Sequence, residues 1–472
     1  MIRTSPPKPR ARPRTRALRP INRRSAPLAN SPGVGSAPHR RTSSRTDARS
    51  RAATDEYATP AAATSRDTPA PKPTITNTGS IPSSVHCGVL EDLRRRLVSH
   101  HGLTHPQGVG RDGVRRVLSR LRCIQLDPLD PLGSQADLVA LARVDELARG
   151  EVYDALLPGH AFEHFAKERC LLPRAAFPHY RRAARAAPWW RATERMKRLT
   201  EDQLDIVEDE VRRRGPLSPS QLSDHGRVEP IDWNGWKGTG KAGTMALEVL
   251  TMRCRLVVCG RSGREKVYDL PERSLGEHVD PEEDFHRWGL RDRVEACGLL
   301  PTSTGPWWGQ LYHVRKAVVA EALAAGEVER IELPGVRRTW IAPAGFRDRP
   351  VEEPDDRMRI LGPLDPLIWD RTLVKLLFGF DYVWEVYKPA KDRRWGWYVV
   401  PLLHRGRFVG RLDARFVDGR IRIDRRWVEE GEELDERAFE EALHRHERAL
   451  GGAVTATSGT GTTPASPTPS RP

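Results

Sequence analysis

The chain has 472 residues, of which 38% are hydrophobic, so it can bury a large core and is expected to form about two to four domains. It contains no run of about 18 apolar residues, which argues against a transmembrane helix, and no secretory signal is expected at its start. Its six cysteines form no CxxC pair and have no zinc-finger spacing with histidine. We therefore expect a cytoplasmic protein with reduced thiols and with no metal or organic cofactor.

The positive charge is unevenly distributed along the chain. The formal net charge is +15, yet residues 1–80 contain 16 Lys and Arg against 4 Asp and Glu, and the remainder contains 62 against 59. A basic chain attracts nucleic acid without regard to base sequence. Here that argument supports only an encounter assisted by the N-terminal segment, and the folded part would have to bind through local patches.

Residues 1–84 are rich in Pro, Ser, Thr, Ala and Arg and contain few large apolar residues, so they cannot offset the entropy cost of ordering. We expect disorder there and in the Gly/Thr/Ser/Pro-rich residues 451–472. Two interpretations of the first segment stay open. It is either a basic arm that holds the protein near DNA, or a non-functional extension that arises from a start codon placed too far upstream.

The first ordered unit is predicted over residues 85–195. Apolar residues recur there at helical spacing, and three short helices joined by turns predict a helix-turn-helix core. The segment Cys-Ile-Gln-Leu-Asp-Pro at 123–128 separates the second helix from the third, because Pro128 breaks any helix. The expected helices cover residues 90–98, 114–121 and 134–147.

Unit 196–276 has the winged-helix order of three helices followed by a β-hairpin, and unit 277–350 repeats that pattern more loosely, with two helices before its strand pair. In the second unit a serine after Gly215-Pro is placed to cap a short middle helix. Its expected helices are 203–214 and 241–253, and its strands 256–259 and 266–270 flank a wing tip at 261–264. In the third unit the expected helices are 288–299 and 311–325, and the strands are 328–333 and 338–341.

A β-domain is predicted over 351–430, followed by a charged helix over 431–450. Alternating segments separated by turn residues predict antiparallel strands at 383–387, 395–403, 407–416 and 420–423. The predicted fold class is therefore α+β, with tandem winged helix-turn-helix units, an antiparallel β-domain and disordered termini.

Four ordered segments resemble one family. They are IQLDPLDPLGSQADLVALAR from residue 124, FEHFAKERCLLP at 162–173, VYDLPER at 267–273, and LGPLDPLIWDR at 361–371 with its continuation to 413. Together they resemble the AlkZ/AlkX (YcaQ-type) bacterial DNA glycosylases over roughly residues 88–425. The resemblance implies tandem winged helices and a β-domain around a DNA-binding channel, and the release of alkylated bases from DNA.

The sequence departs from the family pattern at one place and indicates a branch at another. His164 and Phe165 replace the Tyr and Trp of the FEYW version of the second segment. The motif at residues 125–127 is Gln-x-Asp, as in the AlkX-like branch, and not Gln-x-Gln. That branch implies action on N7-alkylguanine and on interstrand cross-links, with alkylated or cross-linked double-stranded DNA as the partner and a nucleoid-associated location.

The resemblance makes Gln125 and Asp127 the candidate catalytic residues. Breaking an N-glycosidic bond develops positive charge on the sugar, which a carboxylate stabilises while it accepts a proton from water. In an extended segment, alternate side chains share one face, and Pro128 favours that conformation at Asp127. Without the family, the pair would be a turn or a helix cap. No lysine stands beside the motif in the sequence, so we expect a monofunctional glycosylase and not a Schiff-base lyase.

Cations at hairpin tips are the candidate DNA contacts. The first β-hairpin of the β-domain has a basic tip flanked by Trp395 and Trp397, which suits a probe of the minor groove, although a solvated hairpin over core tryptophans is equally open. Arg371 either reaches a phosphate or pairs with Asp365 or Asp370. The full set of candidates is Lys391, Arg393 and Arg394 at the hairpin, Arg371, and Arg261 and Arg264 at the wing.

Two non-enzymatic functions compete with the glycosylase. One is a winged-helix transcriptional regulator, and the other is a damage-binding factor that has lost activity. Three winged units, a nearly neutral body and the lack of an evident ligand-sensing domain argue against a regulator, and the retained Gln125 and Asp127 argue against an inactive factor. We expect a monomer.

Overall fold

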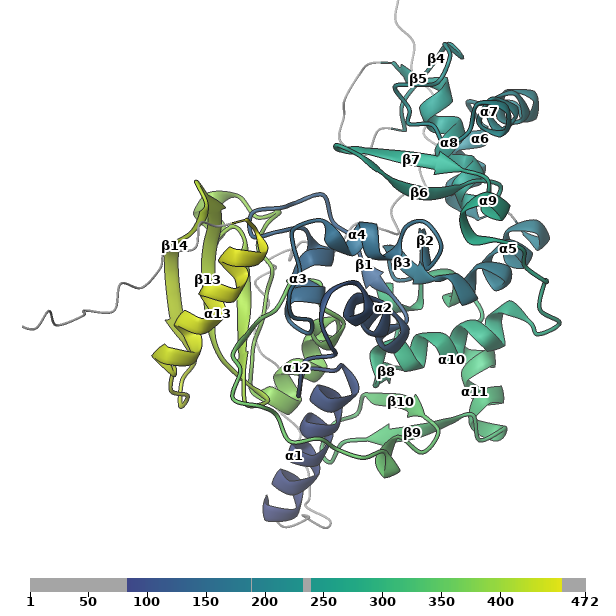
Figure 1. The fold of residues 1–472 in the computed structure, drawn as a ribbon. Helices are drawn as coiled ribbons and strands as arrows, with labels where there is room; N and C mark the ends of the chain where they lie inside the picture. Colours follow the sequence, from purple (N-terminus) through teal and green to yellow (C-terminus); the bar gives the residue numbers. More distant parts are fainter. Residues whose placement is uncertain (1–82, 188, 232–238, 452–472) are drawn as a thin grey trace, which may run out of the picture. The chain divides into compact units, whose positions relative to one another are not determined.

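The computed structural model describes residues 83–187, 189–231 and 239–451 (Figure 1). The predicted disorder at 1–84 and 451–472 therefore falls almost wholly outside the described residues. The described chain is an α+β protein with several small antiparallel sheets, as predicted.

The first unit has a helical part followed by a hairpin. Ser134 and Asp137 form a capping box at the start of α3, and the predicted apolar stripe from Val114 to Leu121 is buried. β1, β3 and β2 form one antiparallel sheet in that order. The elements are α1 (Ser83–His100), α2 (Gly110–Leu121), β1 (Ile124–Gln125), α3 (Gln135–Leu141), α4 (Glu151–Leu156), β2 (Ala161–Phe165), β3 (Arg169–Pro173), η1 (Arg174–Ala176), α5 (Phe177–Ala186) and α6 (Trp190–Met196).

The predicted single helix over 134–147 is wrong. The backbone N–H groups of Arg143 and Val144 both donate to the carbonyl of Ala140, which ends α3 early, and α4 starts after Gly150. The hairpin β2–β3 follows these helices in the chain. No strands were predicted for this segment, which was recognised in the sequence only by its family resemblance.

The second unit is drawn in teal at the top of Figure 1. Thr200 and Gln203 form a capping box at α7, and Leu217 bridges to Tyr268 beside the hairpin β6–β7. The predicted short helix after Pro216 is instead one turn, in which Gln221 N–H donates to the Ser218 carbonyl. The elements are α7 (Glu201–Arg214), β4 (Arg227–Val228), β5 (Gly240–Lys241), α8 (Ala242–Met252), β6 (Val257–Ser262), β7 (Glu265–Asp269) and α9 (Pro271–Leu275).

The third unit repeats the order of the first. Its sheet has the order β8-β10-β9, which corresponds to β1-β3-β2 in the first unit. Asp284 caps the first helix through the backbone N–H groups of His286 and Arg287. The elements are α10 (Phe285–Cys297), β8 (Leu300–Pro301), η2 (Pro306–Leu311), α11 (Arg315–Ala324), β9 (Val328–Glu332), β10 (Thr339–Pro343) and η3 (Phe346–Asp348).

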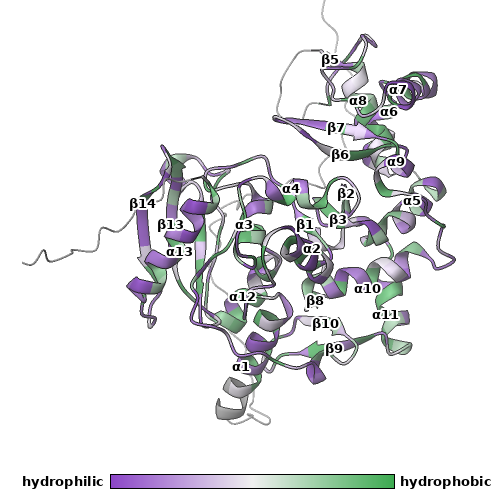
Figure 2. Cartoon of the chain, in the orientation of Figure 1, coloured by the Kyte–Doolittle hydropathy of each residue, from purple (hydrophilic) through white to green (hydrophobic). Residues whose placement is uncertain are grey.

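The β-domain is a four-stranded antiparallel sheet in sequence order. Its edge strand β14 carries mainly hydrophilic residues (Figure 2), and such charges oppose pairing with another chain. The predicted strand at 383–387 is wrong, because β11 occupies that place in the sheet and residues 383–398 form a loop. The elements are β11 (Arg359–Ile360), η4 (Pro366–Ile368), α12 (Arg371–Phe378), η5 (Ala390–Asp392), β12 (Val399–His404), β13 (Arg407–Val417), β14 (Arg420–Val428) and α13 (Glu436–Ala449).

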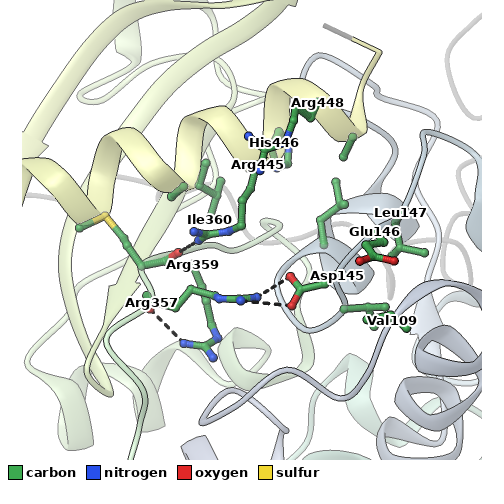
Figure 3. Close-up of a pocket in the computed structure, with 15 residues that line it drawn as sticks. Val109, Asp145, Glu146, Leu147, Arg357, Arg359, Ile360, Arg445, His446 and Arg448 are labelled. Carbon is green, nitrogen blue, oxygen red and sulfur yellow. Dashed lines mark hydrogen bonds and ion pairs between the residues drawn. The ribbon is translucent and has the colours of Figure 1, made fainter. Parts of the chain in front are cut away.

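Ion pairs join the β-domain to the first unit. Arg143 forms a bidentate ion pair with Asp365, with N–O distances of 2.7 and 2.9 Å, and both side chains are fully buried. Arg357 forms another with Asp145 at 2.6 and 3.1 Å, in the wall of a cavity of about 400 Å³ beneath α13 (Figure 3). Neither Gln125 nor Asp127 lines this cavity, so it belongs to the joint between the units and not to the motif.

Candidate active site at strand β1

The Gln-x-Asp motif begins on strand β1, whose extended backbone includes Gln125. Gln125 pairs with Cys170 in the ladder between β1 and β3, and the Leu126 N–H donates to the Arg169 carbonyl at 2.8 Å. The extended backbone therefore continues to the residue before Asp127. Gln125 is buried and Asp127 is half-buried, so the motif leads from the protein interior toward solvent.

The Asp127 carboxylate has no cationic partner among the described residues. Its Oδ1 accepts a 2.9 Å hydrogen bond from the Leu129 N–H. An aspartate whose only role is to stabilise a turn would make the same contact. That bond occupies one oxygen only, and no described side chain donates to Oδ2. Burial raises the pKa of Asp127, and the Leu129 bond only partly opposes that rise. The site thus holds a carboxylate that is partly desolvated and not neutralised.

Tyr387 lies close enough to Asp127 for the two charges to interact. Its pKa is raised by burial and by the Asp127 carboxylate, although 83% of its surface is exposed. Asp127 also contributes to the raised pKa of Tyr398, after burial and Tyr382. The loop at 383–398 therefore reaches the motif. The proximity of Tyr387 to Asp127 could not be predicted from the sequence, since 260 positions separate the two residues.

Lys167 lies beside the motif, which overturns the expectation that no lysine does so. It stands in the β2–β3 turn, and its Nζ donates to Gln125 Oε1 at 2.9 Å. The same Nζ lies 5.0 Å from the ring centre of Trp369. Burial and the nearby Arg371 cation lower the pKa of Lys167 to about 8. The expectation failed because it considered neighbours in sequence, whereas Lys167 is 42 residues from Gln125.

The segment 361–371 acts as a scaffold around this site. Asp365 takes the buried pair with Arg143, and Asp370 caps α12 while it accepts a 2.9 Å bond from Trp340 Nε1. Neither expected role of Arg371 is found, because its Nη2 donates to the Pro363 carbonyl at 2.7 Å and its guanidinium covers the Tyr382 ring at 4.4 Å. Burial lowers the pKa of Arg371 to about 10. Arg371 is an interior cation beside Lys167 and not a surface phosphate contact.

At the wing of the second unit, Arg261 and Arg264 lie in different surroundings. Arg261 pairs with the fully buried Glu163, together with Lys266 Nζ at 2.6 Å, and it covers the Tyr153 ring at 4.4 Å. Arg261 is thus held in an ion pair with Glu163 and against Tyr153, and its predicted contact with phosphate stays a prediction. Arg264 is exposed in the turn, and its side chain has no ion pair among the described residues.

The loop at 383–398 replaces the predicted hairpin. The buried Glu385 carboxylate organises it, accepting bonds from the Trp395 N–H at 2.7 Å and from Lys388 Nζ at 2.8 Å. Arg393 is half-buried, and its Nε donates to the Lys388 carbonyl within the same loop at 2.8 Å. Lys391 is exposed and unpaired within the described chain.

Two aromatic residues flank the basic part of this loop. Trp395 packs between Arg394 at 4.4 Å and the buried Arg411 at 4.2 Å, so it anchors the loop. Trp397 remains 41% exposed. Trp395 is therefore half-buried and Trp397 faces solvent, and neither tryptophan is part of the hydrophobic core.

The described residues contain neither a membrane-spanning helix nor a cluster of metal ligands. No helix there is long and apolar enough to cross a membrane. Within the same ranges, no three His, Cys, Asp or Glu side chains are grouped so that they could hold a metal ion.

Comparison with known proteins identifies the family. The solved structure of Streptomyces sahachiroi DNA glycosylase AlkZ is similar, with 18% sequence identity and a TM-score of 0.48, over 77% of this chain and 96% of that chain. The sequence pattern of the family described as "DNA glycosylase AlkZ-like" matches residues 118–449, which is more than half of the chain. The chain therefore belongs to the AlkZ-like family of DNA glycosylases.

Proposed function

We propose that this chain removes N7-alkylated purines from double-stranded DNA, with Asp127 and Gln125 as its catalytic residues. One observation carries the proposal: Asp127 is a partly buried carboxylate, without a countercharge among the described residues, two positions from an amide on an extended strand. This arrangement supports assignment to the Gln-x-Asp branch of the family.

The chemistry needs few groups because the lesion is already activated. An N7-alkylated purine carries positive charge and leaves without a strong general acid. The Asp127 carboxylate then stabilises the positive sugar and takes a proton from the attacking water. The Gln125 amide holds the same water, and Lys167 limits the rotation of that amide by donating to its Oε1. Base release leaves an abasic site in the DNA.

The loop at 383–398 is the proposed DNA contact nearest to the reacting sugar. Tyr387 lies beside Asp127, while Lys391 and Arg394 are exposed on the same loop. Arg264 is a second, more peripheral phosphate contact. We further propose that the protein is a monomer associated with the nucleoid, and that it also acts on interstrand cross-links between N7 positions. A cross-linked base cannot be turned out of the duplex freely, so its release would measure how open the site is.

The direct test uses a duplex with a single N7-methylguanine and measures the freed base by mass spectrometry in single turnover. Wild-type protein should release the base, and Asp127→Asn should lower the rate by roughly 10²–10⁴-fold, the range expected for loss of a general base. Gln125→Ala should cause a smaller loss.

Asp130→Asn is the matched control, because Asp130 lies three positions further along and pairs with Arg149 at 2.6 Å near the surface. It should retain the wild-type rate within about threefold, in keeping with the small effect of exposed ion pairs. A second duplex with an N7-linked cross-link separates the two proposed substrates. Tight DNA binding without base release from either duplex would contradict the glycosylase and favour a non-catalytic DNA-binding protein.

A further inference from the structure

We infer that Lys167 is a nucleophile that gives this chain a second activity, the cleavage of abasic sites through a Schiff base. The inference rests on the proposed function, since it places the second step at the same motif. It departs from the monofunctional glycosylase that the sequence predicts, because that prediction depended on the absence of a nearby lysine.

The position of Lys167 is the first support. Its amine lies 2.9 Å from Gln125 Oε1, so an abasic sugar held by Gln125 and Asp127 would have its C1′ carbon near Nζ. The amine has no carboxylate within ion-pair distance among the described residues, and its contacts are an amide oxygen and the face of Trp369. Most protein lysines, by contrast, are solvated or paired with a carboxylate. No carboxylate in the described residues therefore forms an ion pair with Nζ.

The surroundings of Lys167 are the second support. A lysine becomes nucleophilic when it is desolvated or placed next to another cation. Both conditions are met, because Lys167 is half-buried and Arg371 supplies a cation that has no carboxylate partner in the described chain. The resulting pKa of about 8 leaves a useful fraction of neutral amine at physiological pH.

The groups that face Lys167 come from four elements. Arg371 at the start of α12 opposes its protonation, whereas Cys170 on β3, Glu168 in the same turn and Cys297 on α10 favour it. Burial and Arg371 outweigh the other three, so the net shift is downward.

The reaction balances without an oxidant or a reductant. The neutral amine adds to the open-chain aldehyde at C1′, and loss of water gives a protonated imine. The Asp127 carboxylate takes a proton from C2′, the C3′–O bond breaks, and the 3′-phosphate leaves with the electron pair. Water then hydrolyses the conjugated imine, which returns the lysine amine and releases an unsaturated aldehyde on the 5′ fragment.

The test uses a duplex with a preformed abasic site, so that its result does not depend on base release. With cyanoborohydride present, wild-type protein should form a covalent adduct that mass spectrometry maps to Lys167. Lys167→Arg keeps the positive charge and a donor for Gln125 but cannot form the imine, and it should lose at least about 90% of the adduct. Lys375→Arg changes an exposed lysine that is paired with Asp381, and it should react like wild type.

The pH dependence of adduct formation is a second measurement. A lysine with only a structural role would not determine it. Adduct formation should rise with pH and reach half of its maximum near pH 8, where Lys167 loses its proton. Arg371→Met removes the neighbouring cation and should shift this midpoint upward, provided that circular dichroism shows a folded protein.

Two results would overturn the inference: no adduct with folded wild-type protein up to pH 9, or an adduct that persists in Lys167→Arg. The two proposals fail separately. A protein that releases N7-methylguanine but forms no adduct keeps the glycosylase and loses the lyase, and the reverse result keeps the lyase alone.

Discussion

Two carboxylates flank strand β3 of the first unit, and their surroundings are opposite. Glu163 on β2 is fully buried and is surrounded by Arg261, by Lys266 at 2.6 Å and by Arg169 at 3.9 Å. Asp127, just after β1, is half-buried and has no cation in the described chain.

The two pKa values move in opposite directions for that reason. Burial raises the pKa of both groups, but at Glu163 the Lys266 and Arg261 charges reverse the effect and lower it. Glu163 is therefore the centre of a structural ion cluster, which holds the hairpin β6–β7 of the second unit to the first unit. Asp127 keeps an uncompensated charge, as a group that must stabilise a cationic transition state does.

The largest expected effect on stability is at Glu163. Glu163→Ala leaves Arg261 and Lys266 partly buried and unpaired, and it should lower the free energy of unfolding by about 3–5 kcal/mol. Denaturant unfolding measures this change. Glu201→Ala, which breaks an exposed pair with Arg253, is the control and should cost no more than about 1 kcal/mol. Equal losses in the two variants would contradict the assigned role of Glu163.

The next effect is a pH dependence that distinguishes the two carboxylates. In the proposed mechanism base release needs ionised Asp127, so its rate should fall about tenfold per pH unit below the raised pKa of that residue, at a higher pH than for an ordinary aspartate. Single-turnover rates from neutral pH downward, corrected for spontaneous base loss, measure this limb. If the residual activity of Asp127→Asn showed the same fall in rate at acidic pH, another group would be responsible for that fall.

Stability should depend on pH with opposite signs at the two sites. Glu163 has a lowered pKa, so its contribution is present at neutral pH and is lost as the pH falls through that value. Asp127 has a raised pKa, so it costs stability at neutral pH, and this cost disappears as the pH falls. Asp127→Asn should accordingly be at least as stable as wild type at neutral pH, whereas a clear loss would give Asp127 a structural role.

The smallest effect concerns DNA affinity. Lys391→Ala should reduce the slope of log Kd against log salt concentration by about 1, because one phosphate contact is lost. Arg261→Ala should leave that slope unchanged in folded protein, since Arg261 is held by Glu163 and the Tyr153 ring and we expect it not to reach phosphate. Fluorescence anisotropy at several salt concentrations compares the two variants. A lower slope for Arg261→Ala would show that the wing pair opens on DNA.

Patterns that are local in sequence predicted much of the fold. Apolar residues at helical spacing identified α2 and α7, and the turn at 261–264 identified the hairpin β6–β7. The strand predicted at 383–387 failed because Glu385 is buried there and binds the Trp395 N–H, which closes a loop where a ladder was expected. A short alternating segment cannot reveal such a contact.

The candidate site shows the same difference between local sequence patterns and tertiary contacts. Gln125 and Asp127 were proposed from the family resemblance of their motif, and the structure shows an extended backbone at Gln125. Lys167 and Tyr387 were missed because each reaches the motif only through the tertiary fold. The ion pair of Arg261 was missed for the same reason, since its partner Glu163 lies 98 residues away.

The most direct test of this account compares Asp127→Asn with Glu163→Gln in two assays on the same preparations. One assay is single-turnover release of N7-methylguanine at a temperature where both variants are folded, and the other is denaturant unfolding. We predict that Asp127→Asn loses roughly 10²–10⁴-fold in rate with no loss of stability. Glu163→Gln should lose stability while its rate stays within about tenfold of wild type. An Asp127→Asn protein that releases the base at the wild-type rate would contradict the central claim.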